Sequence, residues 1–416
     1  MQNILIINQY ASTPFSGYGG RSFYLVSELA KKHESCLVLA NHTHLLRNVS
    51  EQNSGVEHNF GFPFRIIAIK VLKTRSSRSF VRIINWMLFM VKLCLLSESN
   101  IGFRPTKIIY SSPSLIGYVG AYVLSRRYKS KLYFEVRDIW PLTIVSISGQ
   151  YGKNILVRLM QKIEKFAYET CDGLVSSLSS LPEHVAKVSR IKLPFLFLPN
   201  GIQLVEKNRS SQTKLVRSKE VRNILSRVLE LQKHGRKVVC YCGGLAPANA
   251  MELFVEAASV AEKEQHIFWL VVGDGPEKDK LETLSQNHLL KNIEFFPSVE
   301  KEDVPLVLAA VDVLFLAHHF LDLYSYGVSP MKLPEYLVSG TPIIHVTNSL
   351  SLLKLFKCWL VVPVFEAKAI VAAVCQICDM DDIELQRHSD TAVQSAKSFL
   401  LYENLANELG EFVRLN

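Results

Sequence analysis

Short apolar segments alternate with helical segments along most of this chain, and this alternation constrains the fold more than any other feature. The first series begins with the continuous apolar run Ile4–Ile7, then a loop and a helical stretch at Ser22–Ala30. Further strands are predicted at Ser35–Ala40, Arg65–Val71, Lys107–Tyr110, Lys131–Val136, Gly173–Ser176 and Phe195–Leu198. Because helices that connect successive strands make those strands parallel, such a chain forms a mostly parallel sheet covered on both faces. We therefore predict an α/β fold.

The pattern stops after Ile202 and starts again at Lys237. The second series has predicted strands at Val238–Cys242, Phe268–Val272, Ile293–Phe296, Val311–Leu316 and from Pro342 onward. A chain of 416 residues is too long for one typical core, so two similar domains are expected. We expect a first domain over residues 1–204, a solvated linker with a helix in its middle over 205–236, a second domain over 237–395, and closing helices over 396–416, for which a return to the first domain is one option.

The N-terminus and the cysteine content indicate where the protein works. The first residues form a predicted buried strand, without the basic region or small-residue cleavage site of a secretory signal. Eight cysteines lack disulfide-like spacing, which favours a reducing compartment. We therefore expect a cytoplasmic protein that acts on the inner face of the cell membrane.

A basic segment supports the membrane part of that expectation. Residues 65–107 contain nine Lys or Arg and one acid, Glu98. The apolar run 80–96 lies inside this segment, and its two cations make it a poor transmembrane helix. Residues 75–105 could present Trp86, Leu88 and Phe89 to an anionic membrane, or they could form a buried helix with a basic edge. Nucleic acid is not expected, because stacking aromatics between basic residues are lacking.

The stretch 324–344 is the strongest candidate for a ligand site. It is predicted to form a Gly/Ser/Pro loop and then a short helix that starts near Pro330 and stops at Gly340. Free backbone N–H groups at a loop and helix start favour an anion. Lys332 adds a positive charge, and Glu335 offers a carboxylate to hydroxyl groups, which together suit a nucleotide sugar. An ordinary helix start with a surface Lys–Glu pair remains an alternative.

Two further strand ends carry candidate residues. A Gly-rich loop follows the first strand, where Gly19 and Gly20 would let a ligand approach the backbone and Arg21 is a possible anion contact. Tight-turn geometry explains these glycines equally well. The strand Lys131–Val136 ends in Glu135, Arg137 and Asp138, at the edge where parallel sheets bind ligands.

Taken together, these stretches resemble family 4 glycosyltransferases of the GT-B fold, most clearly in the second half. Residues 271–281 look like the family's strand-end loop beside the donor nucleotide, and 199–202 like the end of its first domain. The resemblance implies two Rossmann-like domains with parallel sheets facing a central cleft. It implies donor contacts at Gly243, Gly244, Gly273, Asp274, Gly275, Val299, Gly327, Val328, Ser329, Pro330, Lys332 and Glu335, together with Gly19, Gly20 and Arg21.

The departures from the family pattern concern charge. Gly327 stands where the family has the first of two Glu, and Glu335 takes the second place. Gly244 and Asn249 stand where an Arg and a Lys usually meet the diphosphate, and Arg137 replaces a His. A departing diphosphate needs fixed positive potential. We therefore favour Lys332 for this task, with Arg137 and Arg21 as the other candidate cations.

A narrower resemblance concerns function. Residues 326–333 and 137–141 look most like bacterial L-fucosamine transferases of O-antigen and capsule assembly. This implies a retaining, metal-independent transfer of an N-acetylated amino sugar from a UDP-sugar to a polyprenyl-diphosphate-linked saccharide, without a cofactor. The implied catalytic residues are Lys332, Glu335, Asp138 and Arg137, although Asp138 could instead pair with Arg137. A UDP-GlcNAc 2-epimerase of the same fold and a non-catalytic membrane-bound homologue are the alternatives.

Overall fold

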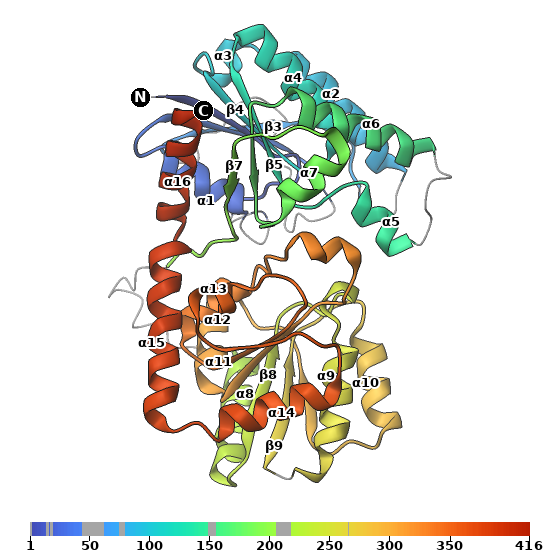
Figure 1. The fold of residues 1–416 in the computed structure, drawn as a ribbon, viewed down its shortest axis with the longest axis vertical. Helices are drawn as coiled ribbons and strands as arrows, with labels where there is room; N and C mark the ends of the chain where they lie inside the picture. The colour runs from blue at the N-terminus through green and yellow to red at the C-terminus, as the bar shows by residue number, and fades with distance from the viewer. Residues whose placement is uncertain are drawn as a thin grey trace. The chain divides into compact units, whose positions relative to one another are not determined.

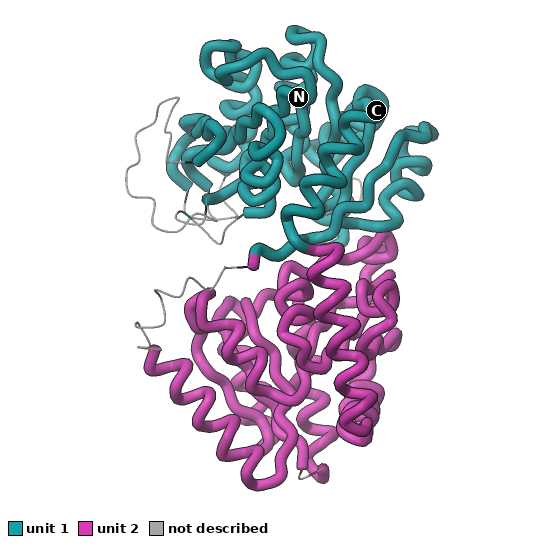
Figure 2. The backbone as a smooth tube through the Cα atoms, turned by 90° about the vertical axis from the view of Figure 1, so that its left-hand side faces the viewer, with its two compact units in different colours: residues 1–203, 401–416 teal, residues 204–400 magenta. Residues whose placement is uncertain are grey.

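The computed structural model describes residues 2–13, 16, 20–43, 62–74, 80–148, 155–204, 218–264 and 266–416. The chain forms two compact units, one of residues 1–203 with 401–416 and one of residues 204–400 (Figure 2). Each unit is built on a parallel sheet with helices on both faces (Figure 1). The α/β class predicted from the alternation is confirmed.

The sheet of the first unit has seven strands in the order β3-β2-β1-β4-β5-β6-β7, and every pairing is parallel. Its strands are β1 (Asn3–Ile7), β2 (Glu34–Ala40), β3 (Arg65–Ile69), β4 (Lys107–Ser111), β5 (Lys131–Val136), β6 (Gly173–Ser176) and β7 (Phe195–Phe197). Ile4 to Ile7 in the interior strand β1 are almost fully buried. Such continuous apolar runs are expected where helices cover both faces.

The helices of this unit include the end of the chain. They are α1 (Arg21–Leu29), α2 (Val81–Cys94), α3 (Glu98–Ile101), α4 (Leu115–Tyr128), α5 (Leu142–Ser148), α6 (Ile155–Thr170), α7 (Leu181–Ser189) and α16 (Tyr402–Leu415). Helix α16 packs on α1, and Tyr402 stacks on Tyr24 with ring centroids 4.9 Å apart. The return of the chain to the first unit begins at Leu401, five residues after the boundary predicted at 396.

Helix α2 shows where the aromatic side chains of the basic segment lie. Trp86 and Phe89 are buried. The Trp86 ring packs edge-on against Trp140, its Nε1 donates to the Tyr10 hydroxyl at 2.7 Å, and α2 packs against α4. Of the two alternatives that the sequence left open, a membrane-facing or a buried position, the buried one holds for these two aromatics. The exposed apolar side chains of this region are Phe80, Ile84, Met87, Val91 and Leu95. Residues 75–79 of the predicted segment lie outside the described residues.

The second unit has a six-stranded sheet in the order β10-β9-β8-β11-β12-β13, again parallel throughout. Its strands are β8 (Lys237–Cys242), β9 (Ile267–Val272), β10 (Ile293–Phe296), β11 (Val313–Ala317), β12 (Ile343–Val346) and β13 (Leu360–Val362). Strand β13 was not predicted.

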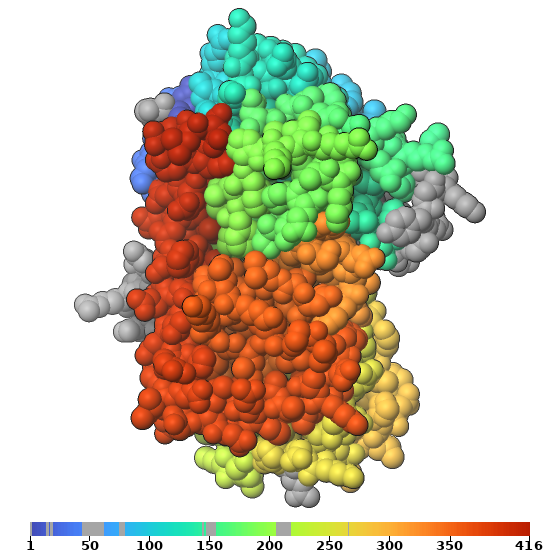
Figure 3. Space-filling model, viewed as in Figure 1, coloured from blue at the N-terminus to red at the C-terminus, as the bar shows by residue number. Residues whose placement is uncertain are grey.

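Eight helices and three short 3-10 turns surround this second sheet in the described part of the unit. The helices are α8 (Lys219–Lys233), α9 (Glu252–Val260), α10 (Lys278–Asn287), α11 (Val304–Ala310), α12 (Leu333–Ser339), α13 (Leu352–Phe356), α14 (Ala367–Cys378) and α15 (Asp382–Phe399). The turns are η2 (Pro247–Asn249), η3 (Ala261–Lys263) and η4 (Asp322–Tyr326). Helix α15 covers α12 and α13, and its outer face lies on the surface (Figure 3).

Helix α8 belongs to the second unit, so the linker predicted over residues 205–236 is too long at its C-terminal end. Its side chains Val221, Ile224, Val228 and Leu231 are buried, and the helix packs on α11 and β8. Residues 219–233 thus belong to the second unit, and residues 205–217 lie outside the described part of the chain. All eight cysteines are free thiols. In the described part of the chain, no helix is both long and apolar enough to cross a membrane.

Candidate functional site

Three predicted donor glycines meet at the carboxyl end of the second sheet. Gly243 directly follows strand β8 and Gly273 directly follows strand β9, and the two loops touch through their backbones. A Cβ built on Gly273 would lie 1.9 Å from the carbonyl oxygen of Gly243, and one on Gly275 would lie 2.4 Å from that of Leu245. Larger residues do not fit, because backbone atoms would have to move. Close packing of the two loops therefore requires these glycines.

The Lys332 side chain passes over Gly243 to reach the carboxyl end of the sheet. A Cβ on Gly243 would lie 1.8 Å from Lys332 Cε, so the missing side chain leaves the passage that the lysine occupies. Lys332 Nζ donates a hydrogen bond to the hydroxyl oxygen of Tyr241 at 2.8 Å and lies 4.8 Å from the centre of the tyrosine ring. That hydroxyl in turn donates to the Gly244 carbonyl at 2.6 Å. A ring face attracts a cation without neutralising it.

The charge of Lys332 is therefore held in place but not paired. Within the described residues, no carboxylate lies within ion-pair distance of its Nζ atom. Burial lowers the pKa of Lys332 to about 8, although Cys242 and Glu335 act in the opposite direction. A partly desolvated cation without a counter-charge is an electrostatic site for an anion.

Helix α12 fixes Lys332 and Glu335 relative to the glycine loops. Tyr336 is buried, and its hydroxyl accepts a hydrogen bond from Cys242 N at 2.9 Å and donates one to Cys242 O at 3.0 Å. Glu335 lies in the first turn of the helix and is half-buried. Burial raises the pKa of Glu335, while Lys301 and Lys332 oppose the shift. The carboxylate thus lies beside the lysine at the same edge of the sheet.

The bounds of this helix differ from the prediction at one end. Gly340 ends the helix in the left-handed conformation at φ 75°, as predicted. At the other end the helix starts at Leu333, with Lys332 as N-cap, so Pro330 lies outside it and Pro334 occupies the first turn. Lys332 is thus a cap residue and not a residue within the helix.

Hydrogen bonds to the Tyr324 carbonyl anchor the loop before this helix. Gly327 has φ 117°, and its N–H donates to the Tyr324 carbonyl at 3.0 Å. The same carbonyl accepts a hydrogen bond from Ser349 Oγ. Val328, Ser329 and Pro330 follow, all half-buried. A positive φ favours glycine, so the turn itself accounts for the glycine at this position.

Asp274 organises the neighbouring loop with its side chain. Its two oxygens accept hydrogen bonds from Lys278 Nζ and Ser298 N, both at 2.8 Å. These bonds, the one from Lys278 foremost, lower the pKa of Asp274 to about 2. The bond to Ser298 ties the loop after β9 to the one that carries Val299. Asp274 thus shapes the loop that the sequence analysis assigned to the nucleotide.

In the first unit, Arg21 does not have the predicted role. Its guanidinium is buried, lies 2.7 Å from Glu135 Oε1 and donates to the carbonyls of Leu198 and Pro199. Burial alone would raise the pKa of Glu135, but Arg21 and Arg137 hold it below its ordinary value. Because Arg21 has no exposed surface, we reassign it from an anion contact to a structural ion pair.

The remaining first-unit candidates lie near that pair. Arg137 is half-buried and Asp138 is exposed, and both backbone N–H groups donate to Ser112 Oγ. The described side chains of Arg137 and Asp138 form no ion pair with each other. Gly20 caps α1, and a Cβ on it would lie 3.1 Å from Ser12 O. Gly19 lies outside the described residues.

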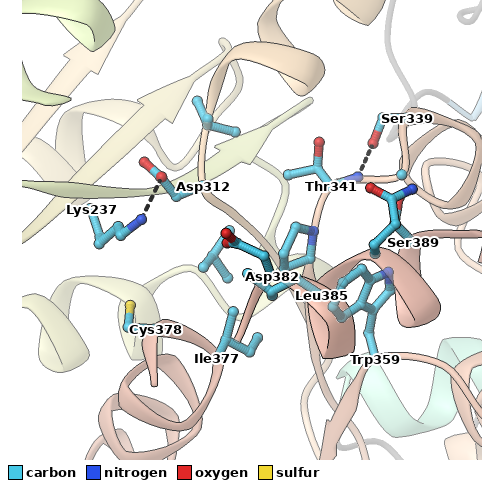
Figure 4. Close-up of a pocket in the computed structure, with 15 residues that line it drawn as sticks. Lys237, Asp312, Ser339, Thr341, Trp359, Ile377, Cys378, Asp382, Leu385 and Ser389 are labelled. Carbon is cyan, nitrogen blue, oxygen red and sulfur yellow. Dashed lines mark hydrogen bonds and ion pairs between the residues drawn. The ribbon is translucent and has the colours of Figure 1, made fainter. Parts of the chain in front are cut away.

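The sequence analysis missed Tyr241 and Tyr336, which hold Lys332 and α12. A tyrosine inside a buried strand or helix needs a partner for its hydroxyl, and that was the available signal. A pocket of about 490 Å³ also lies in the second unit, at the amino ends of β8, β11 and β12 (Figure 4). Lys237, Asp312 and Thr341 line it, so it lies at the opposite edge of the sheet from Lys332.

Comparisons with known proteins support a glycosyltransferase. Residues 226–394 match the model of the family described as glycosyl transferases, group 1. A protein of Escherichia coli strain K12, described as the colanic acid biosynthesis glycosyl transferase WcaI, is 21% identical over 212 residues, which cover 50% of each chain. The present chain thus spans about half the length of this curated relative.

Solved structures resemble the whole chain. Sucrose-phosphate synthase from Thermosynechococcus elongatus has a TM-score of 0.70 at 16% identity and covers 100% of this chain and 99% of its own. Anabaena HepE in complex with UDP and glucose has a TM-score of 0.63 at 12% identity, with 100% of both chains covered. The predicted GT-B fold is confirmed. Residues 226–394, which match the group 1 model, lie within the second of the two units, residues 204–400.

Proposed function

We propose that this protein is a glycosyltransferase that moves a sugar from a UDP-sugar to a saccharide carried on a polyprenyl diphosphate, in the assembly of a bacterial surface polysaccharide. The observation that carries the proposal is the unpaired cation Lys332, held by Tyr241 at the carboxyl end of the second sheet. The group 1 match over residues 226–394 and the relative described for colanic acid biosynthesis support it. HepE, described in complex with UDP and glucose, supports UDP as the nucleotide.

The proposed chemistry follows from the charges present. The bond between the sugar C1 and the diphosphate oxygen breaks, and a bond between C1 and an acceptor hydroxyl oxygen forms on the same face, with retention. The hydroxyl proton passes to the departing phosphate oxygen, so no separate base is required. Lys332 stabilises the charge that develops on the diphosphate. Glu335 accepts hydrogen bonds from the ribose hydroxyls, and Asp138 contacts the acceptor hydroxyl.

The proposal includes no metal and no cofactor. Lys332, with the backbone N–H groups of Val328 and Ser329, would take the place that a divalent ion occupies in metal-dependent transferases. We propose an N-acetylated amino sugar as the donor sugar, on the basis of the resemblance of residues 326–333 and 137–141.

A transfer assay tests this function. The protein is incubated with a panel of UDP-sugars and a short lipid-diphosphate-linked saccharide, and products are detected by mass with and without EDTA. We expect the acceptor to gain the mass of one N-acetylated amino sugar, equally in both conditions. Formation of an epimer from UDP-GlcNAc alone would indicate the epimerase instead. UDP binding without transfer to any acceptor would indicate a non-catalytic homologue.

A lipid-linked acceptor also implies contact with the membrane surface, and we propose that α2 provides it. Phe80, Ile84, Met87, Val91 and Leu95 are exposed at spacings of three or four residues, so they share one face of the helix. This apolar stripe lies within the basic segment 65–107. An apolar helix face with basic surroundings favours the surface of an anionic bilayer. The proposed location is therefore the inner face of the cell membrane.

Liposome flotation tests this contact. We expect binding to anionic vesicles that weakens with salt and is absent for neutral vesicles. The double variant Met87→Glu/Val91→Glu should abolish binding, because it puts two charges on the exposed stripe. Leu229→Glu is the matched control, since Leu229 is equally exposed on α8. Unchanged binding of the double variant would contradict the assignment to α2.

A further inference from the structure

A chain of three hydrogen-bonded side chains runs from the core of the second unit to its carboxyl edge. His345 in β12 is fully buried, and its Nδ1 lies 2.9 Å from Ser351 Oγ. Its Nε2 lies 3.4 Å from Nδ1 of His318, which follows β11 and is half-buried. We call these three residues the Ser351–His345–His318 relay. The proposed transfer reaction assigns no role to these three residues.

The donors and acceptors available to the three side chains determine which atom of each one carries the proton. Ser351 caps α13, so its Oγ accepts a hydrogen bond from Leu353 N at 3.2 Å. The hydroxyl proton is buried and needs an acceptor, and among the described contacts His345 Nδ1 supplies it. His345 then carries its proton on Nε2 and donates to His318 Nδ1. As a result, His318 carries its own proton on Nε2.

The opposite direction would leave the serine proton unpaired in the core, which costs about 1–3 kcal/mol. Both imidazoles also remain neutral at neutral pH. Burial lowers the pKa of His318 to about 4, with Lys332 and His319 adding to the effect. Burial also holds the pKa of His345 well below its ordinary value, and His318 acts in the same direction. His318 Nε2 is thus a neutral donor whose proton position is fixed.

The relay contacts the residues that anchor the loop assigned to the donor diphosphate. The His318 ring packs against Tyr324 with centroids 5.9 Å apart and planes at 71°. The Tyr324 carbonyl accepts from Gly327 N and from Ser349 Oγ, which lies two residues before Ser351. The ring contact with Tyr324 and the two hydrogen bonds to the Tyr324 carbonyl therefore connect His318 to the loop that precedes Lys332.

We propose that His318 is a donor-binding residue whose Nε2–H hydrogen-bonds an oxygen of the nucleotide diphosphate, with Ser351 and His345 as positioning residues that hold it in this tautomer. The inference rests on the proposed function, since it assumes that a diphosphate binds beside Lys332. A neutral N–H donor adds to the stabilisation that one lysine provides. It requires no counter-charge when the site is empty.

Nuclear magnetic resonance tests the direction of the relay without any activity. In protein labelled with 15N-histidine, long-range 1H–15N spectra at neutral pH should show His318 and His345 protonated on Nε2, with assignments from His318→Gln and His345→Gln. Adding UDP should shift the His318 Nε2 resonance. A proton on His345 Nδ1, or a His318 resonance unchanged at saturating UDP, would overturn the proposal.

Calorimetry with UDP and uridine tests the contact with the diphosphate. His318→Asn removes the Nε2 donor, and we expect roughly tenfold to hundredfold weaker UDP binding with unchanged uridine binding, as for a hydrogen bond to a charged group. His318→Gln, whose amide reaches the same place, should recover most of this loss. His319→Gln is the matched control, because His319 Nε2 instead contacts Pro247 O at 2.9 Å.

Ser351→Asp should invert the relay. The aspartate still caps α13 but donates no proton, so His345 would move its proton to Nδ1 and His318 would present a lone pair to the diphosphate. We expect a UDP affinity at least as low as that of His318→Asn, with Ser351→Thr close to wild type. UDP binding unaffected in both His318→Asn and Ser351→Asp would overturn this inference and leave the proposed function standing. A wild-type protein that binds no UDP would overturn both.

Discussion

Both units place a cation at the carboxyl end of their sheet, but the two cations are held in different ways. Arg21 in the first unit is buried, with 0% of its side chain exposed, and it pairs with Glu135, which is 4% exposed. Two backbone carbonyls take up its other N–H groups. Lys332 in the second unit is held by a neutral hydroxyl and a ring face. The charge of Arg21 is neutralised within the protein, whereas the charge of Lys332 remains available to a ligand.

This difference separates a structural charge from a binding charge. A buried arginine with a carboxylate and two carbonyls joins α1 and β5 to the chain after β7, and it gains nothing from a ligand. A half-buried lysine without a carboxylate pays a desolvation penalty that an anion would relieve. We infer that the first arrangement maintains the fold and that the second one binds the diphosphate.

Removing each charge should therefore have opposite effects on stability. Arg21→Met leaves Glu135 buried without a partner, and we expect a loss of about 3–5 kcal/mol in the free energy of unfolding. Lys332→Met should be nearly neutral or stabilising, because it removes an unpaired charge. Urea unfolding of the three proteins measures both effects. Equal destabilisation by the two variants would contradict the comparison.

The pKa of Lys332 gives a second test, in which stability and affinity move in opposite directions. The folded pKa is about 8 and the ordinary value is 10.5. Between these values the unfolded chain holds a proton that the folded chain lacks, so the stability contribution of this group rises with pH. The affinity for UDP should fall in the same window, by up to about tenfold per pH unit, because binding favours charged Lys332.

Calorimetry and urea unfolding between pH 7 and pH 10 would measure both trends. Lys332→Arg should remove both, since arginine stays charged throughout this range. A UDP affinity that is independent of pH in the wild type would argue against a role for Lys332 in binding.

The smallest expected effect concerns the passage that Lys332 uses. Gly243→Ala places a Cβ where Lys332 Cε lies, and the lysine must move. We expect UDP affinity to fall by roughly tenfold, the size of one misplaced charge-assisted hydrogen bond. The same substitution in a Lys332→Ala background should have little further effect. Additive losses in this double-mutant cycle would mean that Gly243 acts independently of the lysine.

The fold was predictable because buried parallel strands are visible as apolar runs, and β5, β6 and β10 have the predicted bounds. Two exceptions have physical reasons. The sequence predicts a linker over helix α8 because the exposed face of the helix is highly polar, although its four buried apolar residues follow helical spacing. The sequence leaves open a membrane-facing or a buried position for the aromatics of α2, because it does not show which face packs on another helix.

The candidate site was only partly predictable. Lys332, Glu335 and the glycines stood out through their loop and helix context. Arg21 looked equally available, since its partner Glu135 is more than a hundred residues away and no local pattern connects them. The Ser351–His345–His318 relay joins residues after two neighbouring strands and is visible only once β11 and β12 are paired.

The most direct test of this account is a ligand-truncation cycle. The affinities of wild type and of Lys332→Ala are measured by calorimetry for UDP and for uridine, with Lys237→Ala as control, because Lys237 lies at the opposite edge of the same sheet. We predict a roughly hundredfold loss for UDP in Lys332→Ala, comparable to losing one preorganised electrostatic contact, and no loss for uridine. An equal loss for both ligands, or none for UDP, would contradict the assignment of Lys332 to the diphosphate.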